Sequence, residues 1–106
     1  MTTPVFGKIT ETKHIHPWFT RELLRRYPKA YVYKPQGGAY GKKGAHDFIF
    51  CIDGKFFTVE AKVVSNTMSP MQLSTQRNVQ GAGGFSECLT GKDETIFERI
   101  EKWRTA

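Results

Sequence analysis

The segment from Gly44 to Lys62, GAHDFIFCIDGKFFTVEAK, constrains the fold more than any other part of the chain. Two runs of aromatic and β-branched residues, 48–52 and 56–59, flank the dipeptide Asp53-Gly54. Asp-Gly favours a two-residue type I′ turn, because both central positions of that turn take positive φ. The segment is therefore predicted to form a β-hairpin.

The turn also sets which residues face each other across the hairpin. A two-residue turn pairs Ile52 with Lys55 and places Asp47 opposite Glu60, with Lys62 on the same face because side chains alternate along a strand. Two like charges placed opposite each other are destabilising. A divalent cation bound between the two carboxylates would reverse the sign of that interaction. The pairing therefore suggests a cation site beside an amine.

Two alternatives to this interpretation remain open. A type I turn with a bulge at Gly54 would shift the pairing by one residue and place Asp47 opposite Ala61. In addition, exposed acidic and basic residues at the end of a strand are common and often have no function beyond solubility.

The rest of the chain predicts alternating helical and extended segments in one α/β domain with a mixed sheet flanked by helices. The predicted order is an irregular arm over 1–15, a helix over 17–27, a strand over 30–34, the hairpin, a helix begun by Ser69 and ended by 81–84, a strand over 85–89 and a C-terminal helix over 92–104. Pro17 and Ser69 suit the beginning of a helix, and the glycines of 81–84 suit its end.

Composition limits the classes of protein to consider. The 106 residues fit a single domain, with 16 Lys and Arg against 10 Asp and Glu giving a net charge of +6. A basic surface favours a polyanion as partner, although many small proteins carry one. No apolar run is long enough to span a membrane and no signal sequence is recognisable, so an intracellular, cytoplasmic protein is expected. Cys51 and Cys88 lie in predicted strands without metal-ligand spacing, which indicates buried thiols.

Further candidates come from two short motifs. The glycine-rich segment 36–44, which carries Tyr40, Lys42 and Lys43, predicts a loop that contacts phosphate, or else an ordinary connector. His14 and His16 have a spacing that could bind a metal as an interaction tag, but a capping or solvated role is more common.

The order of these motifs resembles the PD-(D/E)XK nuclease superfamily. The resemblance lies in AYVYK, GKKGAHDFIFCIDGKFFTVEAK, SPMQ and a Gly-Gly pair eleven residues after that glutamine, within about Phe19 to Phe85. More narrowly, the chain is similar to the stand-alone VRR-NUC and Holliday-junction-resolvase-like nucleases of bacteriophages. The resemblance implies a restriction-endonuclease-like αβββαβ core over 17–89. The chain departs from the pattern at His46, where these nucleases usually have proline.

The resemblance implies a role for each matching residue. Asp47, Glu60 and the backbone carbonyl of Ala61 would bind Mg²⁺ or Mn²⁺, and Lys62 would position or deprotonate the attacking water. Gln72 would face the site from its helix. The first helix would supply a further acid, either Glu22 or, if the helix begins earlier, Glu11. The DNA contacts would come from Lys34, Tyr40, Lys42, Lys43, Gln76 and Arg77.

The expected activity is metal-dependent endonucleolytic hydrolysis of DNA, with branched, flapped or junction DNA as candidate substrates, by a homodimer without a small-molecule cofactor or a membrane partner. The alternative is a nucleic-acid-binding module that retains this fold and has lost the chemistry.

Overall fold

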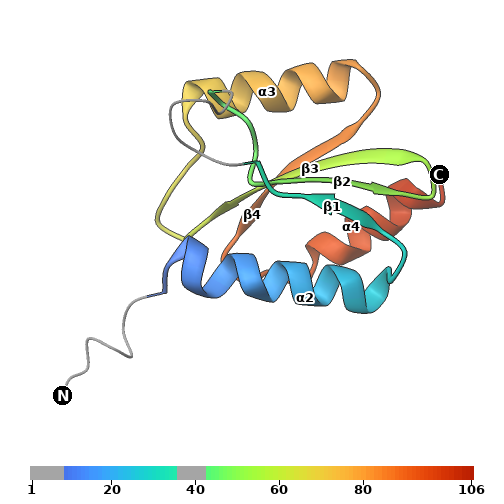
Figure 1. Ribbon diagram of the computed structural model, residues 1–106. Coiled ribbons are helices and arrows are strands. Elements are labelled where there is room, and N and C mark those ends of the chain that lie inside the picture. Colours follow the sequence, from blue (N-terminus) through green and yellow to red (C-terminus); the bar gives the residue numbers. More distant parts are fainter. Residues whose placement is uncertain (1–8, 36–42) are drawn as a thin grey trace.

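The computed structural model describes residues 9–35 and 43–106. Figure 1 shows helices on both sides of one sheet. In chain order the elements are a π-helical turn η1 (Glu11–Ile15), α2 (His16–Arg26), β1 (Tyr31–Tyr33), β2 (Phe48–Ile52), β3 (Lys55–Lys62), α3 (Pro70–Gly81), β4 (Phe85–Thr90) and α4 (Ile96–Arg104). The predicted α/β class and order of elements are confirmed within these residues.

The sheet has four strands in the order β1-β2-β3-β4. The first three strands are antiparallel neighbours, and α3 connects β3 to the parallel strand β4. Asp53 and Gly54 have φ values of 52° and 82°, and Ile52 pairs with Lys55. Both values are positive, as a type I′ turn requires. The predicted hairpin register is confirmed, and the shifted register with a bulge at Gly54 is wrong.

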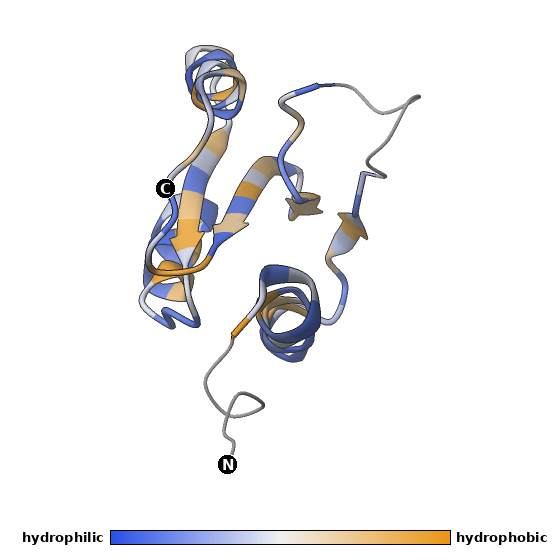
Figure 2. Cartoon of the chain, turned by 90° about the vertical axis from the view of Figure 1, so that its left-hand side faces the viewer, coloured by the Kyte–Doolittle hydropathy of each residue, from blue (hydrophilic) through white to orange (hydrophobic). Residues whose placement is uncertain are grey.

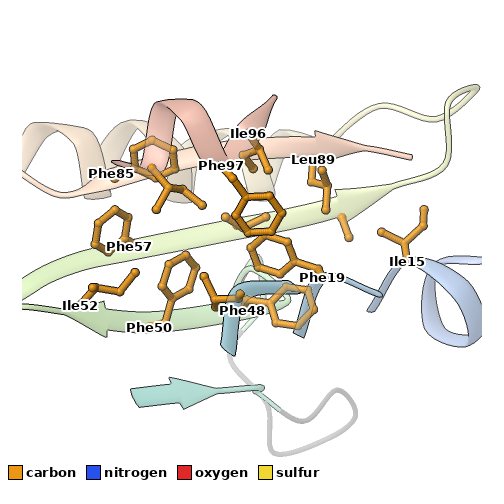
Figure 3. Close-up of a cluster of buried hydrophobic side chains, with 14 residues drawn as sticks. Ile15, Phe19, Phe48, Phe50, Ile52, Phe57, Phe85, Leu89, Ile96 and Phe97 are labelled. Carbon is orange, nitrogen blue, oxygen red and sulfur yellow. The ribbon is translucent and has the colours of Figure 1, made fainter. Parts of the chain in front are cut away.

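The two faces of the sheet are covered differently. In Figure 2, α2 and α3 are seen end-on and lie on opposite sides of the strands. Hydrophobic residues of β2 and β3 fill the space between the sheet and helices α2 and α4 (Figure 3). The ring centroids of Phe50 and Phe57 stack 5.0 Å apart, and those of Phe19 and Phe97 lie 5.4 Å apart. This aromatic core fixes one face of the sheet against α2 and α4.

Helix α3 covers the other face without a hydrophobic anchor, because none of its residues is buried. Ser69 caps it as predicted, accepting a hydrogen bond from the Gln72 amide, while the Gln72 side chain accepts one from the Ser69 amide. Gln76 and Gln80 each donate to the Ser86 carbonyl of β4. The helix is therefore held on the sheet largely by polar contacts.

The N-terminal segment differs from its prediction. An irregular arm was expected over residues 1–15, but Glu11–Ile15 forms a helical turn that Thr10 caps and that continues into α2. Ile15 is completely buried and joins the core. The helix also ends at Arg26 rather than Tyr27. Among the described residues 9–15, Ile15 is the only one that is buried, so the sequence shows little helical periodicity there and its packing could not be seen in it.

Two smaller findings concern exposure. Cys51 and Cys88 are free thiols, as predicted, but both are partly exposed rather than buried. Within residues 9–35 and 43–106, no helix has the length and apolar character needed to cross a bilayer.

The two hairpin phenylalanines Phe50 and Phe56 provide a matched test of this packing. Phe50 is 1% exposed and Phe56 is 48% exposed. We expect Phe50→Ala to reduce the free energy of unfolding by about 3–5 kcal/mol, since it leaves a cavity in the aromatic core. Phe56→Ala should cost about 1 kcal/mol or less. Urea denaturation of both variants measures the difference, and equal losses would contradict this assignment of the two faces.

Candidate active site

Asp47 and Glu60 lie side by side at one end of β2 and β3, and hydrogen bonds interlock them. The Asp47 amide donates to Glu60 Oε1 at 3.2 Å. The Ala61 amide donates to Asp47 Oδ2 at 2.9 Å. The register places both side chains at the same end of the hairpin, as the sequence predicted. Each carboxylate is therefore fixed by the backbone of the other strand.

Lys62 and Gln72 converge on the same glutamate. Lys62 Nζ lies 3.5 Å from Glu60 Oε2. Gln72 Nε2 donates to the same oxygen at 2.9 Å, from the first turn of α3. The structure thus brings together Asp47, Glu60, Lys62 and Gln72, four of the residues that the sequence singled out. Ala61 lies between Glu60 and Lys62 in β3 and contributes its amide to the cluster.

The two carboxyl groups have opposite electrostatic behaviour. Glu60 is only 2% exposed, and burial together with the neighbouring Asp47 charge raises its pKa to about 7. Burial also acts to raise the pKa of Asp47, but contacts with His16 and the Ala61 amide outweigh it and hold that pKa below its usual value. The two carboxyl groups therefore differ in protonation. Asp47 stays ionised, while Glu60 binds a proton near neutral pH.

His16 is a neighbour that the sequence did not predict. Its Nε2 lies 3.3 Å from Asp47 Oδ2, and the residue is 8% exposed. That distance is within hydrogen-bonding range, yet Nε2 makes no hydrogen bond with suitable geometry. His14 contacts the N-cap residue Thr10 instead, accepting a hydrogen bond from its amide at 2.9 Å.

His46 connects the strand end that carries Asp47 to helix α3. The ring is 1% exposed, with Nε2 2.8 Å from the Gln72 carbonyl and Nδ1 3.0 Å from Thr58 Oγ1. A carbonyl oxygen only accepts, so Nε2 donates its proton there and, in the neutral ring, Nδ1 accepts from a hydroxyl group. Gly44 allows the close approach, since a Cβ atom there would lie 2.8 Å from the Met71 carbonyl. The residue in place of the expected proline thus anchors α3.

The two candidates for the additional acid occupy different places. Glu22 Oε1 is bound by Arg25 at 2.9 Å and by Arg26 at 2.7 Å, on the surface of α2. Glu11 Oε2 instead accepts a hydrogen bond from the Val63 amide at 3.2 Å, directly after Lys62. The structure therefore brings Glu11 toward the cluster and engages Glu22 with arginines.

The expected DNA contacts do not gather at one point. Lys34, Lys43 and Arg77 are exposed, whereas Gln76 is partly buried and its amide is bound to the Ser86 carbonyl. Tyr40 and Lys42 lie outside the described residues. In the part of the chain that the structure describes, no group of three or more His, Cys, Asp and Glu side chains is arranged to bind a metal.

Comparisons with family models, with curated proteins and with solved structures found no match for this chain.

Sequence reasoning missed His16 and the anchoring role of His46. His16 directly precedes Pro17 at the beginning of the predicted helix, which was only a weak indication that its side chain has a defined place. His46 precedes Asp47, where the family resemblance implies proline. Neither position shows which partners the ring would meet, because Thr58 and Gln72 are distant in sequence.

The raised pKa of Glu60 predicts that the protein becomes less stable as pH rises from about 5 to 7. Over this range the folded protein keeps a proton on Glu60 that the unfolded chain, with the usual pKa of 4.5, has released. The loss is on the order of 3 kcal/mol at most. Glu60→Gln cannot titrate and should remove this slope in denaturation experiments without divalent ions.

The exposed variant Glu98→Gln is the matched control and should retain the slope. Below about pH 4 the lowered pKa of Asp47 acts in the opposite direction, since its contribution is lost as that carboxylate becomes protonated. Identical pH profiles for wild type and Glu60→Gln between pH 5 and 7 would contradict the assignment.

Proposed function

We propose that this protein is a Mg²⁺- or Mn²⁺-dependent DNA endonuclease of the PD-(D/E)XK type. The observation that carries the proposal is the convergence of two carboxylates from adjacent strands with one lysine, Lys62, which lies 3.5 Å from Glu60. The order of motifs quoted above supports it independently. In the VRR-NUC and resolvase-like nucleases, the corresponding residues carry the chemistry.

The arrangement of the elements also supports a restriction-endonuclease-like core. Helix α2 is followed by three antiparallel strands, and α3 then leads to the parallel strand β4. This is the αβββαβ order implied by the resemblance. The proposed site lies at the end of β2 and β3, on the face that α3 covers.

The residues at the site fit a hard divalent cation. Mg²⁺ is usually bound by one or two carboxylates together with substrate phosphates, so a group of three acidic side chains is not required. Asp47 and Glu60, with the Ala61 carbonyl, would hold the ion. It would also relieve the repulsion that raises the pKa of Glu60. When bound, the ion would supply Lewis-acid chemistry, polarising a phosphate oxygen and increasing the acidity of water.

The side chains around these carboxylates have separate roles in the proposal. The Lys62 ammonium group would stabilise negative charge that develops on the phosphate, or position the attacking water. Gln72 would keep Glu60 oriented through its hydrogen bond to Oε2. Glu11, whose carboxylate accepts from the Val63 amide, would be the acid from the first helix. Because one chain offers one site, a homodimer would be needed to cut two strands together.

Substitution of the site tests the activity directly. We expect Asp47→Ala and Lys62→Ala to reduce Mg²⁺-dependent cleavage of plasmid, flap and four-way-junction DNA by a factor of about 10²–10³ or more, because each removes a group that stabilises developing charge. Cleavage is measured on labelled substrates with Mg²⁺ and with Mn²⁺. Asp93→Ala, which removes an exposed acid outside the site, is the control and should cut like wild type.

Unchanged cleavage in both site variants would refute the proposed site. If wild type cuts none of these substrates but binds them with an affinity that falls steeply with salt, the alternative of a binding module without chemistry is favoured.

Glu11 and Glu22 provide a matched pair for the remaining acid. We expect Glu11→Gln to reduce cleavage by about tenfold or more, because its carboxylate lies beside the residue that follows Lys62. Glu22→Gln should leave cleavage within about twofold, since its partners are the surface residues Arg25 and Arg26. Single-turnover rates with excess enzyme separate this effect from binding. The reverse ranking would assign the role to Glu22.

A further inference from the structure

The part of the sheet near β1 is open on the α3 side and carries aromatic side chains. Tyr31 and Tyr33 of the edge strand β1 are 71% and 52% exposed, and Phe56 of β3 is 48% exposed. The register aligns Tyr31, Cys51 and Phe56 in one row across three strands. The neighbouring row begins at Tyr33 and Ile49. We call Tyr31, Tyr33 and Phe56 the aromatic strip.

The strip is open because α3 is displaced toward the other edge of the sheet. Helix α3 packs on β4 and β3, where Thr58 and Ser86 are each 2% exposed beneath it. The row that starts at the exposed Tyr33 therefore ends at buried residues. Figure 1 shows α3 on this side of the sheet and α2 on the other. Phe56 also borders a groove of about 880 Å³ against α3, which Lys43 lines as well.

The distribution of charge indicates what kind of molecule fits this face. Between Glu60 and Glu87, the stretch that includes α3, the sequence contains Lys62 and Arg77 and no acid. Lys43 lines the groove beside α3. Five of the ten acids follow this stretch, from Glu87 to Glu101, in β4 and around α4 on the opposite face. The layer that holds the strip is therefore basic apart from the candidate site itself.

We propose that the aromatic strip binds unpaired bases of single-stranded DNA. Exposed aromatic rings on a sheet, surrounded by positive charge, are the features by which proteins bind single strands, because every base has a face that can stack. Each such stack contributes about 1–3 kcal/mol. Lys43, which lines the groove beside α3, and Arg77 of α3 are exposed on this side of the sheet, where they can contact the phosphates. A duplex hides its base faces and gains little from the strip.

The strip leads toward the two carboxylates. Tyr33 pairs with Ile49, and Ile49 is two residues from Asp47 on the same face of β2. Two residues of a strand span about 7 Å. That distance is comparable to the spacing of neighbouring phosphates along a stretched single strand. As a statement about the substrate, this inference rests on the proposed function: the DNA that is cut would have an unpaired segment next to the scissile phosphate.

Binding without chemistry tests the strip. The measurement is fluorescence anisotropy of a labelled 12-nucleotide oligo-dT and of a 12-base-pair duplex, in EDTA at low salt. We expect the double variant Tyr31→Ala, Tyr33→Ala to weaken oligo-dT binding by about tenfold or more, with duplex binding changed less than twofold. Phe56→Ala should weaken it by about fivefold or more, consistent with the loss of one stack.

Two controls separate stacking from folding. The double variant Tyr31→Phe, Tyr33→Phe keeps both rings and should bind oligo-dT within about twofold of wild type. Leu24→Ala removes an exposed apolar side chain from α2, on the other side of the sheet, and should have no effect. Thermal melting of all variants checks that they are folded.

Three results would contradict the proposal that the strip binds unpaired bases. These are unchanged oligo-dT binding in the alanine variants, an equal loss of duplex affinity in those variants, or an equal loss of oligo-dT affinity in the phenylalanine variant. A dimer that the alanine variants dissociate, with oligo-dT binding intact, would assign the surface to a second copy of the chain. A separate result would refute the proposed function. If wild type binds oligo-dT through the strip but cuts no substrate, the binding proposal stands and the nuclease proposal is wrong.

Discussion

The structure depends most on the way the backbone holds two like charges together. Asp47 and Glu60 each accept a hydrogen bond from the strand that carries the other residue, so neither carboxylate can turn away without losing a bond. The repulsion appears in the pKa of Glu60, which burial and the Asp47 charge raise to about 7. A chain selected only for stability would gain by replacing Glu60 with an amide or a hydrophobic residue. The costly pair is the main reason to look for function here.

The layer above the pair is built to hold it. Helix α3 has no buried residue, yet its first turn is fixed by the Ser69 cap and by His46, which contacts the Gln72 carbonyl while the Gln72 side chain donates to Glu60. A proline at position 46 could not make these contacts, so this chain uses a polar anchor where the resemblance implies a rigid turn. A displacement of α3 would therefore change the position of Glu60, because the Gln72 side chain is hydrogen-bonded to it.

Local rules predicted much of this structure, and the failures share one cause. Asp53-Gly54 fixed the hairpin register, and with it the meeting of Asp47 and Glu60, because turn geometry and strand alternation act over a few residues. The cap at Ser69 was equally local. In contrast, the burial of Ile15, the turn containing Glu11 and the contacts of His16 and His46 depend on partners far along the chain. Cys51 was expected to be buried because a strand residue usually is, but it lies between the exposed side chains of Tyr31 and Phe56 on the open part of the sheet face.

The separation of the two sheet faces explains how such a small domain can hold an uncovered surface. The aromatic core between the sheet, α2 and α4 supplies the hydrophobic burial, as Figure 3 shows. The opposite face therefore does not have to bury large apolar side chains. That face then carries a polar helix, two carboxylates that repel each other and exposed rings. Two acids of the C-terminal region, Glu87 and Glu101, lie on the core side and form surface ion pairs with Arg99 and Arg104. On the other side, α3 carries Arg77 and no acid, and Lys43 lies beside it. An approaching polyanion would meet Lys43, Lys62 and Arg77 on this face, beside the two carboxylates that would hold the proposed cation.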